Sequence, residues 1–172
     1  MSILDRLLNR TDPRTIMSPL YSAIVAQGRE PHWYIEGGVP DTLDGRFDMI
    51  AAILCAILLR LEGEEAARQQ SVWLTELFIN DMDGQLRQIG IGDMIVGKHI
   101  GKMMSALGGR LAAYREGFAS HADLNAALVR NLYRGDAPKP NQVAHVEVEL
   151  RKLWIALAEV PSERIVQGHI PG

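Results

Sequence analysis

Cysteine, aromatic residues and long apolar runs are all scarce in this chain of 172 residues. Its single cysteine, Cys55, excludes an internal disulfide and a cysteine metal cluster, and its place in an apolar run indicates a small buried side chain. The longest apolar run, residues 49–59, is far shorter than the roughly 20 residues that cross a bilayer. We therefore expect a chain without a membrane-spanning helix, in a reducing compartment.

An excess of basic charge is also lacking. The formal net charge is −3, whereas proteins that bind nucleic acid generally need a basic face. We therefore expect no nucleic-acid partner. Hydrophobic residues make up 47% of the chain and charged residues 23%, which is typical of a globular protein rather than a disordered one.

Motifs for catalysis or for a cofactor are absent from the sequence. No serine, cysteine or lysine lies in a recognisable nucleophile motif, and no pair of acids is marked out by its spacing. The five histidines are scattered, and none is four residues from another histidine or from the cysteine. The sequence thus predicts no enzyme, no metal site and no bound cofactor.

Helical periodicity is what the chain does contain. Residues 49–59 are apolar on every side, which is typical of a helix surrounded by others. Further helices are predicted over about residues 65–88, from Asp93 onward, after Ser120, whose spacing to Asp123 resembles a capping box, and over 143–160. The expected fold is all-α: one compact domain of about six helices around the central apolar one.

Three segments are expected along the chain. Residues 1–17 form an N-terminal segment, 18–160 the helical domain, and 161–172 a polar and loose C-terminal tail. Ser18 is a good N-cap in front of Pro19, so the first domain helix is predicted to begin there.

Residues 29–44 have no helical period and contain several prolines and glycines, which predicts a long ordered loop. Trp33 and Tyr34 make this loop too apolar to hang free. Two interpretations remain open: the aromatic side chains insert into the body of the protein, or they form a surface for a partner.

The least generic stretch is residues 80–111, NDMDGQLRQIGIGDMIVGKHIGKMMSALGGRL. Its second half is predicted to be a helix capped by Asp93. Gly101, Gly108 and Gly109 each cost roughly 1 kcal/mol relative to alanine in a helix. We expect that another backbone comes close to these glycines, or that the helix bends there.

This stretch and residues 31–48, PHWYIEGGVPDTLDGRFD, closely resemble the ubiquinol–cytochrome c chaperone family. The resemblance implies an assembly factor that binds newly made cytochrome b before it joins the reductase complex. Because residues 1–10 lack the apolar core of a signal peptide, we expect a bacterial, cytoplasmic member. Mitochondrial members of the family act with a small partner protein and near the ribosome, but no residue here indicates either partner.

A client is expected to bind in a groove made by residues 33–47 and the two helices that meet at Gly90. The side chains expected to contact it are apolar or basic: Trp33, Tyr34, Leu43, Phe47, Met82, Leu86, Met94, Lys98, Lys102 and Met103. An amphipathic turn at the N-terminus could give transient contact with the inner face of the membrane. The alternative function is a carrier that holds a lipid, a quinone or haem in a helical cavity.

Overall fold

The computed structural model describes residues 12–88, 93–119, 123–136 and 138–171. For residues 86–88, 93–100 and 103 it describes the backbone alone. Every regular element in these described ranges is helical, which confirms the predicted all-α fold. Some predictions lie outside the described side chains. They are the cap at Asp93 and the client contacts of Leu86, Met94, Lys98 and Met103.

Helix α4 (Leu43–Leu61) lies at the centre of the fold, as its uniformly apolar residues 49–59 predict. Thirteen of its 19 residues are buried. The helix begins after Thr42, whose hydroxyl oxygen accepts a hydrogen bond from the Gly45 amide at 3.1 Å. Around α4 pack α2 (Ser18–Gly28), α5 (Arg68–Gln88), α6 (Asp93–Phe118) and α8 (Pro140–Ala158).

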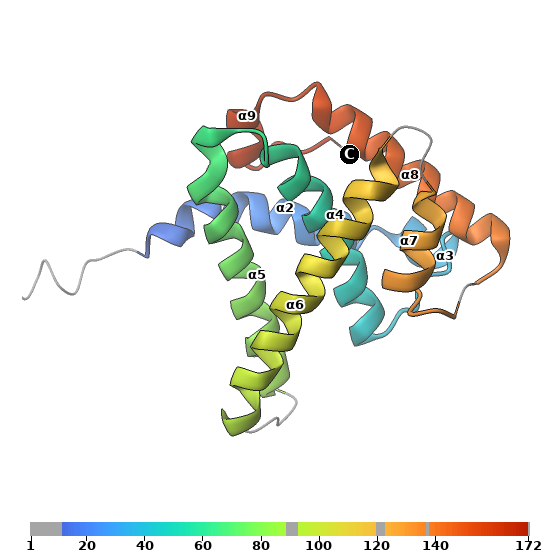
Figure 1. The fold of residues 1–172 in the computed structure, drawn as a ribbon, viewed down its shortest axis with the longest axis horizontal. Coiled ribbons are helices and arrows are strands. Elements are labelled where there is room, and N and C mark those ends of the chain that lie inside the picture. Colours follow the sequence, from blue (N-terminus) through green and yellow to red (C-terminus); the bar gives the residue numbers. More distant parts are fainter. Residues whose placement is uncertain (1–11, 89–92, 120–122, 137, 172) are drawn as a thin grey trace, which may run out of the picture.

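Helices α5 and α6 run side by side and extend beyond the rest of the body at one end (Figure 1). Leu107, Tyr114 and Phe118 on α6 are buried and recur at helical spacing, so one face of this helix packs into the core. On the other side of the core, α7 (Leu124–Asn131) packs against α6 and α8. The predicted cap of α7 needs correction, because Asp123 itself caps the helix by accepting from the Ala126 amide at 3.1 Å.

Residues 29–44 are more helical than predicted, because Pro31–Ile35 forms the short helix α3. Trp33 is 1% exposed, and its indole N–H donates to the Gln27 carbonyl at 2.7 Å. The Tyr133 hydroxyl donates to the Gly37 carbonyl at 2.6 Å and holds the following turn. Insertion into the body is therefore the interpretation that holds for Trp33.

The C-terminal residues are also more ordered than predicted. After Pro161 the chain forms α9 (Ser162–Val166), and Ile165 is fully buried. Before α2 and α5 lie two short 3-10 helices, η1 (Pro13–Met17) and η2 (Glu65–Ala67), and α9 packs on the second. The expectation of a loose tail is wrong for these residues.

Candidate functional site

An open groove of about 550 Å³ separates α5 from α6. Its floor is the C-terminal half of α4, and its walls come from residues 68–79 of α5 and residues 104–115 of α6. The lining is mainly aliphatic: Leu58, Leu59, Val72, Ile79, Met104 and Leu111. Val72 is 48% exposed and Met104 45% exposed, so each wall of the groove has a large apolar side chain exposed to solvent.

The spacing of residues explains why α5 presents this wall. Arg68, Val72, Thr75 and Ile79 recur every three or four residues and so lie along one face of the helix. Other positions of α5 supply the core instead, with Leu74 and Phe78 almost completely buried. The helix thus has an inner apolar face and a second face, at the groove, on which Arg68 and Val72 are exposed while Ile79 is buried.

The glycines of α6 do not have the environment that we expected. A Cβ atom built at Gly101, Gly108 or Gly109 would meet no atom of the described chain within 4 Å. No close backbone in the described chain explains these residues, so the first alternative is wrong, and a bend of the helix stays a prediction. Gly101 and Gly108 follow the same three-to-four spacing as Met104 and Leu111, which places them on the groove side of α6.

Most charges at the rim of the groove are paired. An Arg115 guanidinium nitrogen lies 2.6 Å from a Glu62 carboxylate oxygen, and Arg14 lies 3.7 Å from Glu76. Arg68 is exposed and makes no ion pair with any other described residue. Arg14 is bound more closely by Asp12, so its contact with Glu76 is a weak one. Among the charged side chains that line the groove, Arg68 is therefore the one without an ion-pair partner in the described chain, at the end where α5 begins.

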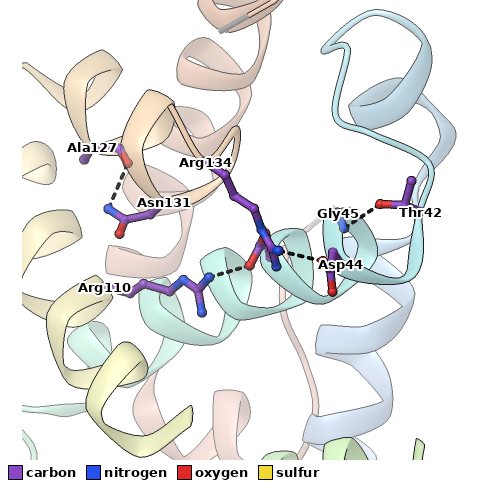
Figure 2. Close-up of polar contacts among 8 residues, drawn as sticks. Thr42, Asp44, Gly45, Arg110, Ala127, Asn131 and Arg134 are labelled. Carbon is purple, nitrogen blue, oxygen red and sulfur yellow. Dashed lines mark hydrogen bonds and ion pairs between the residues drawn. The ribbon is translucent and has the colours of Figure 1, made fainter. Parts of the chain in front are cut away.

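A polar cluster on the opposite side of α6 fixes this helix to the body (Figure 2). Arg110 of α6 donates to the Asp48 carboxylate on α4, whose side chain is fully buried. Arg134, just after α7, donates to the same carboxylate at 2.6 Å and to Asp44 at 2.6 Å. The Arg110 guanidinium also lies 5.2 Å from the centre of the Phe47 ring.

This cluster joins the two stretches on which the family resemblance was based. Phe47 and Asp48 belong to residues 31–48, and Arg110 belongs to residues 80–111. Phe47 also stacks on Phe78 of α5, with ring centres 5.4 Å apart. Asp48, Arg110 and Arg134 were not selected from the sequence, because the expectation there concerned contacts with a client.

None of the described side chains that we expected to contact a client lines the groove. Tyr34 is half-buried and donates its hydroxyl to the Gly28 carbonyl at 2.7 Å, and Met82 is 5% exposed. Leu43 is 48% exposed, and Lys102 is exposed on α6. The sequence thus singled out the two helices that form the walls of the groove but neither the groove itself nor its residues Val72 and Met104.

The described residues contain no group of three or more histidine, cysteine or acidic side chains arranged to hold a metal ion. Burial raises the pKa of the Cys55 thiol to about 12, so this cysteine has little thiolate character. Among the helices in the described ranges, none has the length and apolarity needed to cross a membrane. The most distinctive surface feature in the described part of the chain is therefore the aliphatic groove.

A helical body with an open aliphatic groove defines a protein suited to apolar contacts. The family model for the ubiquinol–cytochrome c chaperone matches residues 36–171, so the chain belongs to that family. Its members are chaperones for assembly of the ubiquinol–cytochrome c reductase complex, and the resemblance predicted from the sequence is confirmed.

The fold is also similar to a crystal structure of the Cbp3 homolog from Brucella abortus. The TM-score is 0.80 at 29% sequence identity, and the match covers 98% of this chain and 95% of that one. Among curated proteins, no match was found.

Proposed function

We propose that the chain captures newly made cytochrome b in the groove between α5 and α6, and releases it to the growing reductase complex without catalysing a reaction. The observation that supports this most directly is the exposure of Val72 and Met104 on facing walls of an aliphatic groove. Cytochrome b is a membrane protein, and an apolar segment outside the bilayer needs such a surface. Capture requires no reactive group, which fits the unreactive character of Cys55.

A groove of this kind suits moderate affinity. Its exposed apolar side chains gain free energy when covered, at roughly 25 cal/mol per Å² of apolar surface, while the loss of free motion on association opposes binding. A client that must be passed on needs a complex of this kind. Binding at the inner face of the cytoplasmic membrane is part of the proposal, because the client becomes a membrane subunit.

The proposal is tested by deleting the gene and recording reduced-minus-oxidised spectra of the membranes. We expect loss of the reductase cytochrome b signal, with other cytochromes retained, and recovery when the wild-type gene is restored. Unchanged spectra together with normal reductase activity would rule out an assembly role for this chain.

The groove is tested in the same strain with Met104→Asp. A carboxylate there should oppose an apolar client, so this variant should restore well under half of the signal. Since Met104 is 45% exposed, folding should hardly change. Ile155→Asp on α8 is the matched control, because Ile155 is 65% exposed and does not line the groove. Equal recovery by both variants would count against the groove.

The alternative is a carrier for a small apolar molecule. The groove volume of about 550 Å³ lies within the usual size range of ligand sites. Native mass spectrometry of the purified chain separates the two functions. A copurifying lipid, quinone or haem, lost in Met104→Asp but retained in Ile155→Asp, would favour the carrier.

A further inference from the structure

We infer that the segment held in the groove is an apolar α-helix that brings an acidic group to Arg68. The inference rests on the proposed function and adds to it the conformation of the client segment and the charge at one of its ends. Three features of the groove support it: the secondary structure of its walls, the open glycines of α6, and the charge at its rim.

The walls select a helix over an extended peptide. An extended peptide binds best by adding to a free sheet edge, but the walls here are α5 and α6, whose backbone groups bond within each helix. From Arg68 to Ile79 the α5 wall is ~17 Å long, at 1.5 Å per residue. That is about three turns of a docked helix, which would present apolar side chains every three or four residues.

The glycines let such a helix come close. Gly101 and Gly108 lie on the groove side of α6, and a Cβ atom at either position would meet no described atom within 4 Å. The absence of a side chain at each glycine therefore leaves more room on the groove side of α6, although no contact inside the described protein requires it. Helix pairs approach most closely where one partner has small residues, as in the packing of membrane helices.

The charge of Arg68 at the rim favours a client helix that has an acidic group at the end near Arg68. Glu62 is paired with Arg115, and Glu76 has a weak contact with Arg14, which Asp12 binds more closely. Arg68, at the start of α5, has no acidic partner among the described residues. An acidic group at the end of the client helix would compensate Arg68, and a basic group would be repelled. For an exposed pair this preference amounts to about two- to fivefold in affinity at low salt.

The experiment measures binding of two fluorescein-labelled peptides to the purified full-length chain by fluorescence anisotropy. Both are helical peptides of about 20 residues with one Leu/Ala/Gly face, and they differ only in a C-terminal Glu or Lys. One charged end is enough, because a helix can dock in either direction. Wild type should bind the Glu peptide about two- to fivefold more tightly, and the difference should shrink at high salt.

Arg68→Glu should reverse the preference, so that the Lys peptide binds more tightly. Arg130→Glu is the matched control: Arg130 is exposed on α7 and is not in the groove, so the wild-type preference should persist. Gly108→Leu should weaken both peptides at least tenfold without lowering the melting temperature, because its side chain would enter open space.

Equal binding of the two peptides, or a preference unchanged by Arg68→Glu, would overturn the inference, as would failure of both peptides to bind. None of these results bears on the deletion strain. Loss of the cytochrome b signal there, with no charge preference here, would leave the proposed function standing and remove only the inferred occupant. Retention of that signal would remove the proposed function itself.

Discussion

At the scale of single residues, Asp48 makes the most consequential contact in the described structure. Its carboxylate is completely buried and accepts hydrogen bonds from Arg110 and Arg134. A buried charge held by two partners gives little net stability compared with apolar packing, but removing it leaves the partners uncompensated. The loss of the carboxylate would be most unfavourable for Arg110, because only 12% of its side chain is exposed to water.

We predict that Asp48→Asn lowers the free energy of unfolding by about 3 kcal/mol. Asp44→Asn is the matched control: it removes the other carboxylate bound by Arg134, but Asp44 is 69% exposed and the loss should stay below about 1 kcal/mol. Urea unfolding followed by circular dichroism measures both values. Similar losses in the two variants would show that burial of Asp48 is not what makes it important.

The Asp48–Arg110 contact could not be predicted from the sequence, because the two residues are 62 positions apart and belong to different helices. Only a three-dimensional structure reveals which of the chain's many charged residues meet. The burial of Cys55 was predictable, since every neighbour in residues 49–59 is apolar and no side of that helix is left for water.

At the scale of elements, Gly101, Gly108 and Gly109 of α6 lower helix stability without allowing a close contact inside the described protein. A glycine inside a helix costs roughly 1 kcal/mol relative to alanine. At Gly108 no neighbouring atom in the described structure would exclude a larger side chain. Gly28 is different: a Cβ atom there would lie 2.9 Å from a side-chain carbon of Ile50 and 3.0 Å from the Ile50 Cα atom. That glycine allows α2 to pack closely on α4.

Gly108→Ala should therefore raise the free energy of unfolding by up to about 1 kcal/mol, through helix propensity alone. Gly28→Ala should lower it by about 1–3 kcal/mol, because α2 or Ile50 must shift. Thermal melts of the two variants beside wild type measure the difference in sign. Destabilisation by Gly108→Ala would reveal a contact inside the protein that makes this glycine necessary.

Helix α3 is linked to α8 by a contact between two histidine side chains. His32 Nδ1 lies 3.1 Å from His145 Nε2, so one ring must donate and the other must accept. Burial of the His32 ring lowers its pKa below the ordinary 6.5, and a charge on His145 lowers it further. The carboxylates that face it, Glu149, Glu30 and Glu36, act in the opposite direction with smaller effect.

A lowered pKa means that folded His32 binds a proton more weakly than unfolded His32. Its stabilising contribution is therefore complete above about pH 6.5 and is lost as pH falls through the folded pKa. The melting temperature should drop between about pH 7 and about pH 5, and less so in His32→Gln. His169→Gln, outside this contact, should retain the wild-type pH dependence; an equal change in both variants would argue against the histidine pair.

The long helices were predictable and the short ones were not. Residues 49–59, 65–88 and 143–160 extend over enough turns for the period of 3.6 to be recognised. Helices α3 and α9 have five residues each; α3 begins at Pro31 and α9 begins directly after Pro161. Their stability comes from the burial of Trp33 and Ile165, which is a tertiary contact rather than a local signal.

At the scale of the whole molecule, one continuous core joins α2, α4, α5, α6, α7 and α8. Cys55 lies within it at 0% exposure and is therefore a natural probe of global unfolding. Its thiol can react only when the helices around α4 separate. A domain of this size with one core is expected to unfold cooperatively.

We predict that a maleimide reagent labels Cys55 in urea with the same midpoint as the loss of helical circular dichroism, and labels the native chain negligibly over an hour. Cys55→Ala, which cannot react, is the control for labelling at other groups. Labelling at a lower urea concentration than the loss of helix would indicate that α4 becomes accessible by partial opening.

The groove between α5 and α6 was the part of the candidate site least predictable from the sequence. Val72 and Met104 are ordinary members of amphipathic helices, and their exposure depends on how far apart the two helices lie above α4. The family resemblance fixed the role of the chain, but the contact residues on which a client would depend emerge only from the packing of these three helices.

The groove between α5 and α6 is open in this structure, and under the proposed function this would govern the kinetics of client exchange. A client need not wait for two helices to separate, so association should run at the ordinary rate for proteins, about 10⁵–10⁷ M⁻¹s⁻¹. Differences between clients would then appear almost wholly in their residence times. A segment that fits the groove poorly would leave within milliseconds, and the time available for handover to the reductase would be set by the dissociation rate alone.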